Sequence, residues 1–231
     1  MVISIHQPQY LPWLGYFDKI DRADIFVFLD DVQFKKNEWQ NRNKIKTARG
    51  WQWITVPVIH KFPQEIRQVK INNTINWRKQ HLASLMINYQ KAAHLDDYID
   101  FFKNLYSREW EYLSELNIYT IKNLLKILGI KTKLVKSSEL KLAGKSTEYL
   151  VNISKRLGAS GYISGEGGRS YLELDKFKHN TIEVFFQDFK CPRYRQLYCQ
   201  SQRFLENLSI VDLLFNEGKE SLNILKGQTR T

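Results

Sequence analysis

The fold is decided by residues 2–31, which read VISIHQPQYLPWLGYFDKIDRADIFVFLDD. Residues 2–6 and residues 24–29 are short apolar runs rich in β-branched and aromatic side chains, so both are predicted to be buried strands. Between them, two prolines hold residues 7–12 in a loop, and residues 13–21 suit a short helix. Strand, loop, helix and strand in this order make a βαβ unit, whose two strands run parallel.

The rest of the chain continues the same alternation. Further strands are expected at residues 51–58, 66–71, 132–136, 161–164 and 181–186, and helices at residues 76–91, 95–113, 117–128 and 146–157. This order predicts an α/β protein with a mainly parallel sheet flanked by helices. We expect a single α/β domain over residues 1–231, with a helical insertion at 76–115 and a helical tail at 200–225.

Composition excludes several classes of protein. A chain of 231 residues with 43% hydrophobic and 26% charged residues folds around its own core without disulfide or metal support. No apolar stretch approaches the ~18–20 residues of a membrane span, and the first residues lack the pattern of a signal peptide, so a cytoplasmic location is expected. Neither the two cysteines nor the histidines have the spacing of metal ligands, and no metal site is predicted.

The charge balance favours anionic partners. The chain has 35 Lys and Arg against 24 Asp and Glu, a net charge of +11. Nucleotides, phosphorylated sugars and RNA are the partners that such a charge attracts, although a soluble basic surface gives the same balance. The motifs of the α/β-hydrolase nucleophile elbow, the P-loop and the Rossmann dinucleotide site do not occur, which argues against those three classes.

Polar segments follow three of the predicted strands, at residues 6–16, 30–36 and 164–171. In an open parallel sheet, ligands bind at the carboxyl ends of the strands, so these segments are expected to share one site. His6 and Asp31 are the candidates for proton transfer. The candidate substrate- and phosphate-binding residues are Gln7, Gln9, Tyr10, Gln33, Lys36, Trp39, Arg42, Asn43, Ser164, Gly165, Gly167 and Arg169.

Two of these groups have a specific chemistry. Gly165 and Gly167 let the backbone approach a ligand closely, and Arg169 can close a phosphate clamp. In the loop or exposed hairpin at residues 35–44, Trp39 can stack on a base or sugar ring while Arg42 binds a phosphate. The alternatives are an ordinary glycine-rich turn, a solvated face anchored by one tryptophan, a structural His6 and an aspartate cap at the second strand.

Residues 5–17, 30–34, 39–43 and 208–218 together resemble the WbqC-like proteins, and the resemblance extends over essentially the whole chain. Members of that family occur with genes for bacterial O-antigen and other surface glycans. The resemblance therefore implies a role in polysaccharide precursor biosynthesis.

The chain is also similar, more distantly, to the HIGH-type nucleotidylyltransferases of the three-layer HUP class. Trp13-Leu14-Gly15-Tyr16 stands where those enzymes have two histidines around a pair that ends in glycine. Residues 163–169 are similar to their phosphate-binding Ile-Ser-Ser-Thr-x-x-Arg loop. This similarity implies nucleotide binding without the usual catalytic histidine pair.

Three hypotheses for function follow. The leading one is a group-transfer enzyme that binds a nucleotide, sugar nucleotide or phosphorylated sugar, with a nucleotide as its expected cofactor if it uses one. The second is a protein that binds RNA or tRNA, or that uses aminoacyl-tRNA as a donor. The third is a non-catalytic scaffold of a glycan-assembly complex. A broad basic stripe indicates RNA, a small pocket with few cations indicates a sugar nucleotide, and a large exposed apolar patch indicates a scaffold.

Overall fold

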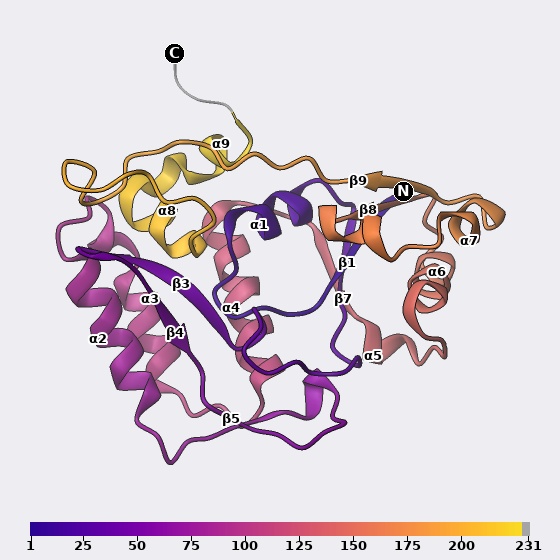
Figure 1. Ribbon diagram of the computed structural model, residues 1–231, viewed down its shortest axis with the longest axis horizontal. Coiled ribbons are helices and arrows are strands. Elements are labelled where there is room, and N and C mark those ends of the chain that lie inside the picture. The colour runs from indigo at the N-terminus through magenta and orange to yellow at the C-terminus, as the bar shows by residue number, and fades with distance from the viewer. Residues whose placement is uncertain (228–231) are drawn as a thin grey trace.

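A five-stranded parallel sheet forms the centre of the computed structural model, which describes residues 1–227 (Figure 1). Across the sheet the strands are β7 (Lys133–Lys136), β2 (Ile25–Phe28), β1 (Val2–His6), β8 (Gly161–Ser164) and β9 (Glu183–Phe186). All four neighbouring pairs are parallel. The chain first extends the sheet from β1 toward β7 and then returns to add β8 and β9 beside β1. The strand order therefore reverses between β1 and β8.

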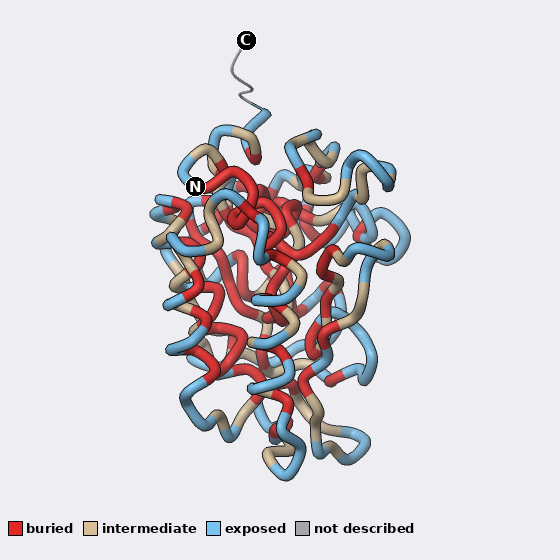
Figure 2. The backbone as a smooth tube through the Cα atoms, turned by 90° about the vertical axis from the view of Figure 1, so that its left-hand side faces the viewer, coloured by how far each residue is buried: buried red, intermediate tan, exposed pale blue. Residues whose placement is uncertain are grey.

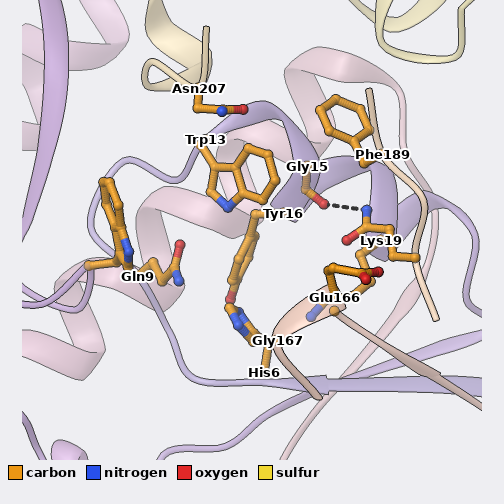
Figure 3. A pocket seen from close by; sticks show the side chains of 13 residues that line it. His6, Gln9, Trp13, Gly15, Tyr16, Lys19, Glu166, Gly167, Phe189 and Asn207 are labelled. Carbon is orange, nitrogen blue, oxygen red and sulfur yellow. Dashed lines mark hydrogen bonds between the residues drawn. The ribbon is translucent and has the colours of Figure 1, made fainter. Parts of the chain in front are cut away.

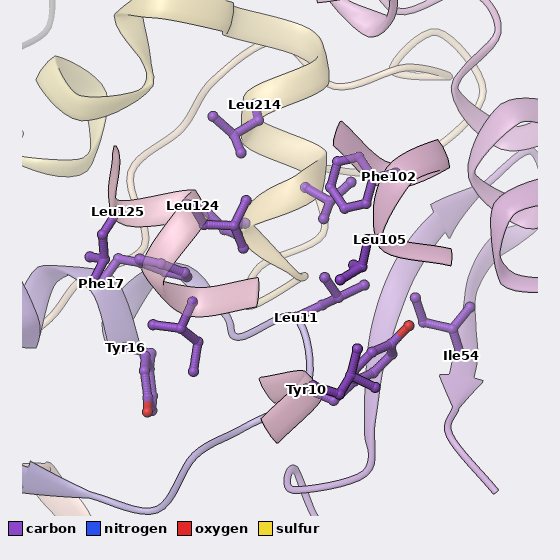
Figure 4. Close-up of a cluster of buried hydrophobic side chains, with 14 of the residues drawn as sticks. Tyr10, Leu11, Tyr16, Phe17, Ile54, Phe102, Leu105, Leu124, Leu125 and Leu214 are labelled. Carbon is purple, nitrogen blue, oxygen red and sulfur yellow. The ribbon is translucent and has the colours of Figure 1, made fainter. Parts of the chain in front are cut away.

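Helices cover both faces of this sheet because its strands are apolar on both sides. Phe26 and Phe28 of β2 point into one core, which they share with α1 (Leu14–Asp21), α4 (Leu113–Leu128) and α8 (Ile210–Glu217). Ile25 and Val27 point into a second core with α6 (Ser146–Arg156) and α7 (Leu174–His179). Figure 4 shows the first core, and Figure 2 shows buried backbone enclosed by exposed turns. The predicted three-layer α/β fold with a parallel sheet is confirmed.

The long connection from β2 to β7 carries the hairpin of β3 (Arg42–Thr47) and β4 (Gly50–Thr55), followed by the short pair β5 (Val58–Ile59) and β6 (Lys70–Ile71). Helices α2 (Trp77–Tyr89) and α3 (Leu95–Ser107) follow and precede α4. The strand expected at 66–71 is wrong for its first half, where Ile66–Gln68 form a 3₁₀ turn closed by a capping box between Glu65 and Gln68.

Two helix boundaries also differ from expectation. The helix expected to run to residue 113 ends at Ser107, and the next helix begins at Leu113 rather than at 117. The cause is an extended segment between them, which is tied to β6 by hydrogen bonds from the Ile71 amide to the Glu111 carbonyl and from the Leu113 amide to the Val69 carbonyl.

The carboxyl-terminal part is helical only from residue 210 onward within the described residues, rather than from 200. Helix α5 (Ser137–Leu140) follows β7, and the 3₁₀ turn η2 (Glu166–Ser170) follows β8. The last elements of the described residues are η3 (Gly218–Glu220) and α9 (Ser221–Leu225). Residues 187–209 contain no helix and no strand. None of the helices in the described part of the chain has the length and apolar character that a bilayer span requires.

Candidate functional site

A pocket of about 390 Å³ opens at the carboxyl ends of β1 and β8, where the strand order reverses (Figure 3). We call it the switch-point pocket. Its wall comes from the β1–α1 segment, from residues 165–167 after β8 and from Gln187 and Phe189 after β9, and is completed by Trp39 and Asn207. This is the position at which open parallel α/β sheets bind their ligands.

Lys19 is the cation of this pocket. It lies on α1, is 3% exposed, and its ammonium nitrogen is 3.8 Å from the position that a Cβ atom on Gly165 would take. No carboxylate or hydrogen-bond acceptor within residues 1–227 pairs with it. Burial lowers its pKa from the ordinary 10.5 to about 7. A buried ammonium without a counter-ion costs free energy, and an anionic ligand in the pocket would offset that cost.

His6 ends β1 at the floor of the same pocket, with its ring centroid 5.1 Å from that of Tyr16. Burial, assisted by the nearby Lys19 charge, holds the pKa of His6 well below 6.5, so the imidazole is neutral at neutral pH. Its buried Nδ1 has no hydrogen-bond partner among the described residues, and the same is true of Oε1 of Gln9. Both atoms are free to hydrogen-bond a ligand.

Trp13 forms an aromatic wall of the pocket, with its ring edge-on to Phe189 at 5.5 Å between centroids. In Figure 3, Tyr16 lies between Trp13 and His6. A Cβ atom on Gly15 would overlap the Trp13 indole, so only glycine allows the indole to lie against the helix at this point. The sequence Trp13-Leu14-Gly15-Tyr16 thus places an aromatic wall at the pocket.

Gly15→Ala is expected to force the Trp13 indole from its place and to cost about 1–3 kcal/mol of stability, the usual penalty for overpacking. Thermal melting of Gly15→Ala, Trp13→Ala and the double variant tests this in a double-mutant cycle. In the Trp13→Ala background, the glycine substitution should lower the melting temperature much less. Equal losses in the two backgrounds would show that the indole is not what Gly15 accommodates.

The glycine-rich segment after β8 only partly takes the expected form. Gly165 and Gly167 line the pocket, and Ser164 is buried with its hydroxyl directed at the Gly165 carbonyl. Arg169, in contrast, is not part of the wall. It pairs with Glu166 at 2.8 Å, and its guanidinium carbon lies 4.3 Å from the centroid of the Phe186 ring.

Asp31 lies in a neighbouring cavity of about 930 Å³, on the α6 side of the sheet edge. The Tyr149 hydroxyl donates a hydrogen bond to it at 2.6 Å and the Ser137 hydroxyl another at 2.5 Å. Gln33 is exposed at the same cavity. A third cavity of about 270 Å³ includes Gln7 and Tyr149, and His6 contributes to both this cavity and the switch-point pocket.

The other candidates from the sequence have different surroundings. Tyr10 is buried in the core, where its hydroxyl contacts His81 at 2.8 Å and Tyr106 at 2.6 Å. Asn43 is buried and donates to the Tyr10 and Leu11 carbonyls, so it holds the loop after β1. Lys36 is exposed, and Arg42 lies over Trp53 with its guanidinium carbon 4.2 Å from the ring centroid. Gln9 and Trp39 line the switch-point pocket.

Sequence reasoning missed Lys19, Gln187, Phe189 and Asn207. Gln187 donates to the Gly15 carbonyl at 2.8 Å and to Asp18 at 2.6 Å, which fastens the segment after β9 to α1. The sequence gives no local signal that singles out Lys19, because the same short helix also contains Asp18 and Asp21. Within residues 1–227, no group of three or more His, Cys, Asp and Glu side chains is arranged to hold a metal ion.

The fold defines a doubly wound α/β protein with a pocket at its switch point. The chain belongs to the WbqC-like protein family, whose model matches residues 7–224. It is 40% identical over 228 residues to the uncharacterized protein Rv1507c of Mycobacterium tuberculosis, with 97% of each chain covered. No solved structure matches it.

Proposed function

We propose that the protein is a group-transfer enzyme of bacterial surface-glycan precursor biosynthesis. Its switch-point pocket would bind a nucleotide, sugar nucleotide or phosphorylated sugar. The glycan role rests on the occurrence of WbqC-like family members with genes for bacterial O-antigen and other surface glycans. The ligand class rests on one observation above the others, the buried and unpaired Lys19 ammonium beneath Gly165.

In this proposal each part of the pocket has one task. Lys19 and the backbone amides of residues 165–167 hold a phosphate group, since a cation next to a glycine-rich turn is a common anion site. Trp13 and Trp39 offer flat apolar surfaces to a base or sugar ring. Arg169 would be a further phosphate ligand once it leaves Glu166.

His6 is assigned to proton transfer, because it lies at the pocket and Asp31 lies in the next cavity. A neutral imidazole whose Nδ1 is free can accept a proton from an attacking hydroxyl or amine. Asp31 would act as a positioning residue through Tyr149, which stands between it and the third cavity.

The test is a thermal-shift panel with ATP, UTP, UDP-glucose and glucose 1-phosphate, and with adenosine and glucose as unphosphorylated controls. At least one phosphorylated compound is expected to raise the melting temperature of the wild type while the controls do not, because a ligand that binds only the folded state stabilises it. Equal shifts by the unphosphorylated controls would contradict a phosphate site. A tRNA arm tests the alternative partner.

Binding of a phosphorylated ligand should weaken as pH rises above about 7. The Lys19 ammonium, with its pKa of about 7 in the free protein, loses its proton in that range and with it the charge that holds the phosphate. Between pH 7 and pH 9, affinity measured by calorimetry should fall roughly tenfold or more. A pH-independent affinity over this range would remove Lys19 from the phosphate site.

A further inference from the structure

Three tryptophans gather on one face of the β3–β4 hairpin and on the turn before it. Trp39 and Trp53 have their ring centroids 5.5 Å apart, and Trp51 and Trp53 have theirs 5.4 Å apart. Trp51 is 44% exposed and Trp39 is 37% exposed, which is unusual for side chains of this size. We call Trp39, Trp51, Trp53, Arg42 and Lys44 the tryptophan face.

Cations accompany these rings. The Lys44 ammonium is 4.3 Å from the ring centroid of Trp51 and 5.1 Å from that of Trp53, and Arg42 lies over Trp53. Neither cation has a carboxylate partner in the described part of the chain, and Nε of Arg42 is buried without a hydrogen bond. Residues 35–55 have five cations that are at least partly exposed, Lys35, Lys36, Arg42, Lys44 and Arg49, against one acidic residue, Glu38.

We propose that the tryptophan face binds single-stranded nucleic acid, without sequence preference. Aromatic rings that stack on bases, combined with cations that follow the phosphates, are the means by which proteins bind single strands. The three rings are inclined to one another by 53° and 83°. Bases on a flexible strand turn independently and can meet such differently oriented rings. The net charge of +11 attracts the strand to the protein.

The tryptophan face is continuous with the switch-point pocket, because Trp39 belongs to both. A strand on the hairpin would therefore have one end at the mouth of that pocket. The proposal does not depend on what the pocket itself binds. Trp51 is not part of the pocket wall, so a Trp51 variant tests the tryptophan face without altering the pocket.

The experiment is fluorescence anisotropy with a labelled 12-nucleotide strand of mixed sequence, as RNA and as DNA, at 50 mM salt. The wild type is expected to bind at least one of them, and Trp51→Ala to weaken binding roughly tenfold or more. Lys44→Gln should reduce the slope of affinity against salt concentration, whereas Lys91→Gln, an exposed lysine near the end of α2, should not. Phe62→Ala, which removes a side chain that is 80% exposed, is the matched aromatic control.

Thermal melting of each variant confirms that it is folded. Since Trp51 is exposed, its replacement should leave the melting temperature close to that of the wild type. The proposal is overturned if neither strand binds, or if Trp51→Ala binds as the wild type does. It is also overturned if polygalacturonate, an acidic polysaccharide, displaces the labelled strand at lower concentration than the unlabelled strand does, because the face would then be a glycan site.

Discussion

Replacing Lys19 with methionine is expected to weaken binding of phosphorylated ligands roughly 10- to 100-fold, the loss of one charge-assisted contact. The same change should raise the melting temperature by several degrees. It exchanges a buried, unpaired ammonium for an apolar side chain of similar length, and this removes the desolvation penalty of the charge, which is on the order of several kcal/mol for a buried ion. Lys155→Met, at an exposed position on α6, is the matched control and should alter neither property.

The gain in stability should depend on pH in a defined direction. Between pH 7 and about 10.5 the folded protein has lost the Lys19 proton while the unfolded chain retains it, so wild-type stability rises with pH in this window. The advantage of Lys19→Met should be largest below pH 7 and should shrink toward pH 10. A variant that is less stable than the wild type at pH 6.5 would show that Lys19 has a structural partner instead.

Asp212→Ala should lower the melting temperature by about 10 °C. The buried Asp212 carboxylate on α8 accepts hydrogen bonds from Tyr89 at 2.9 Å and Tyr194 at 2.7 Å, and the Tyr89 hydroxyl also accepts one from the Lys46 amide at 3.0 Å. Removing it leaves the hydroxyl protons of Tyr89 and Tyr194 without an acceptor, and it takes away the carboxylate near the Lys46 ammonium, at a cost of about 3–5 kcal/mol.

Asp212→Asn keeps the shape of the acceptor and should lose less stability than the alanine variant. Burial raises the pKa of Asp212 to about 6, so between about pH 4 and pH 6 the folded state binds the proton more tightly than the unfolded chain does. The contribution of the Asp212 carboxyl group to the free energy of unfolding therefore grows as pH falls through 6. The Asp212→Asn variant should lack this gain in stability. Asp100→Ala, at an exposed position on α3, is the control. An Asp212→Ala protein that melts with this control would contradict the account of the network.

The parallel sheet could be predicted because its signals are local. Residues 2–31 contain a complete βαβ unit. Each of its strands can be recognised in the sequence as a short apolar run that is followed directly by polar residues. The rule that ligands bind at the carboxyl ends of strands then led to His6 and Gly165, which do meet at one pocket. Topology thus connected segments that are about 160 residues apart in the chain.

Lys19 could not be found in the same way. Residues 14–20 are all buried, so α1 has no exposed face against which a buried lysine would stand out. Its burial depends on the loop after β8 and on Gln187. Gln187 donates a hydrogen bond to Asp18 on the same helix, although the two residues are 169 positions apart in the chain. The partner of Asp31 could not be predicted for a similar reason. Tyr149, which donates a hydrogen bond to Asp31, lies on α6 and is 118 residues further along the chain.

The central claim is that the switch-point pocket, rather than the cavity at Asp31, is where a phosphorylated ligand binds. Hydrogen–deuterium exchange of the wild type with ATP and with UDP-glucose tests it most directly. The account predicts that at least one compound slows exchange in residues 6–19 and 165–168 and leaves residues 31–33 and 141–149 unchanged. Protection confined to residues 31–33 and 141–149, or no protection by either compound, would contradict it.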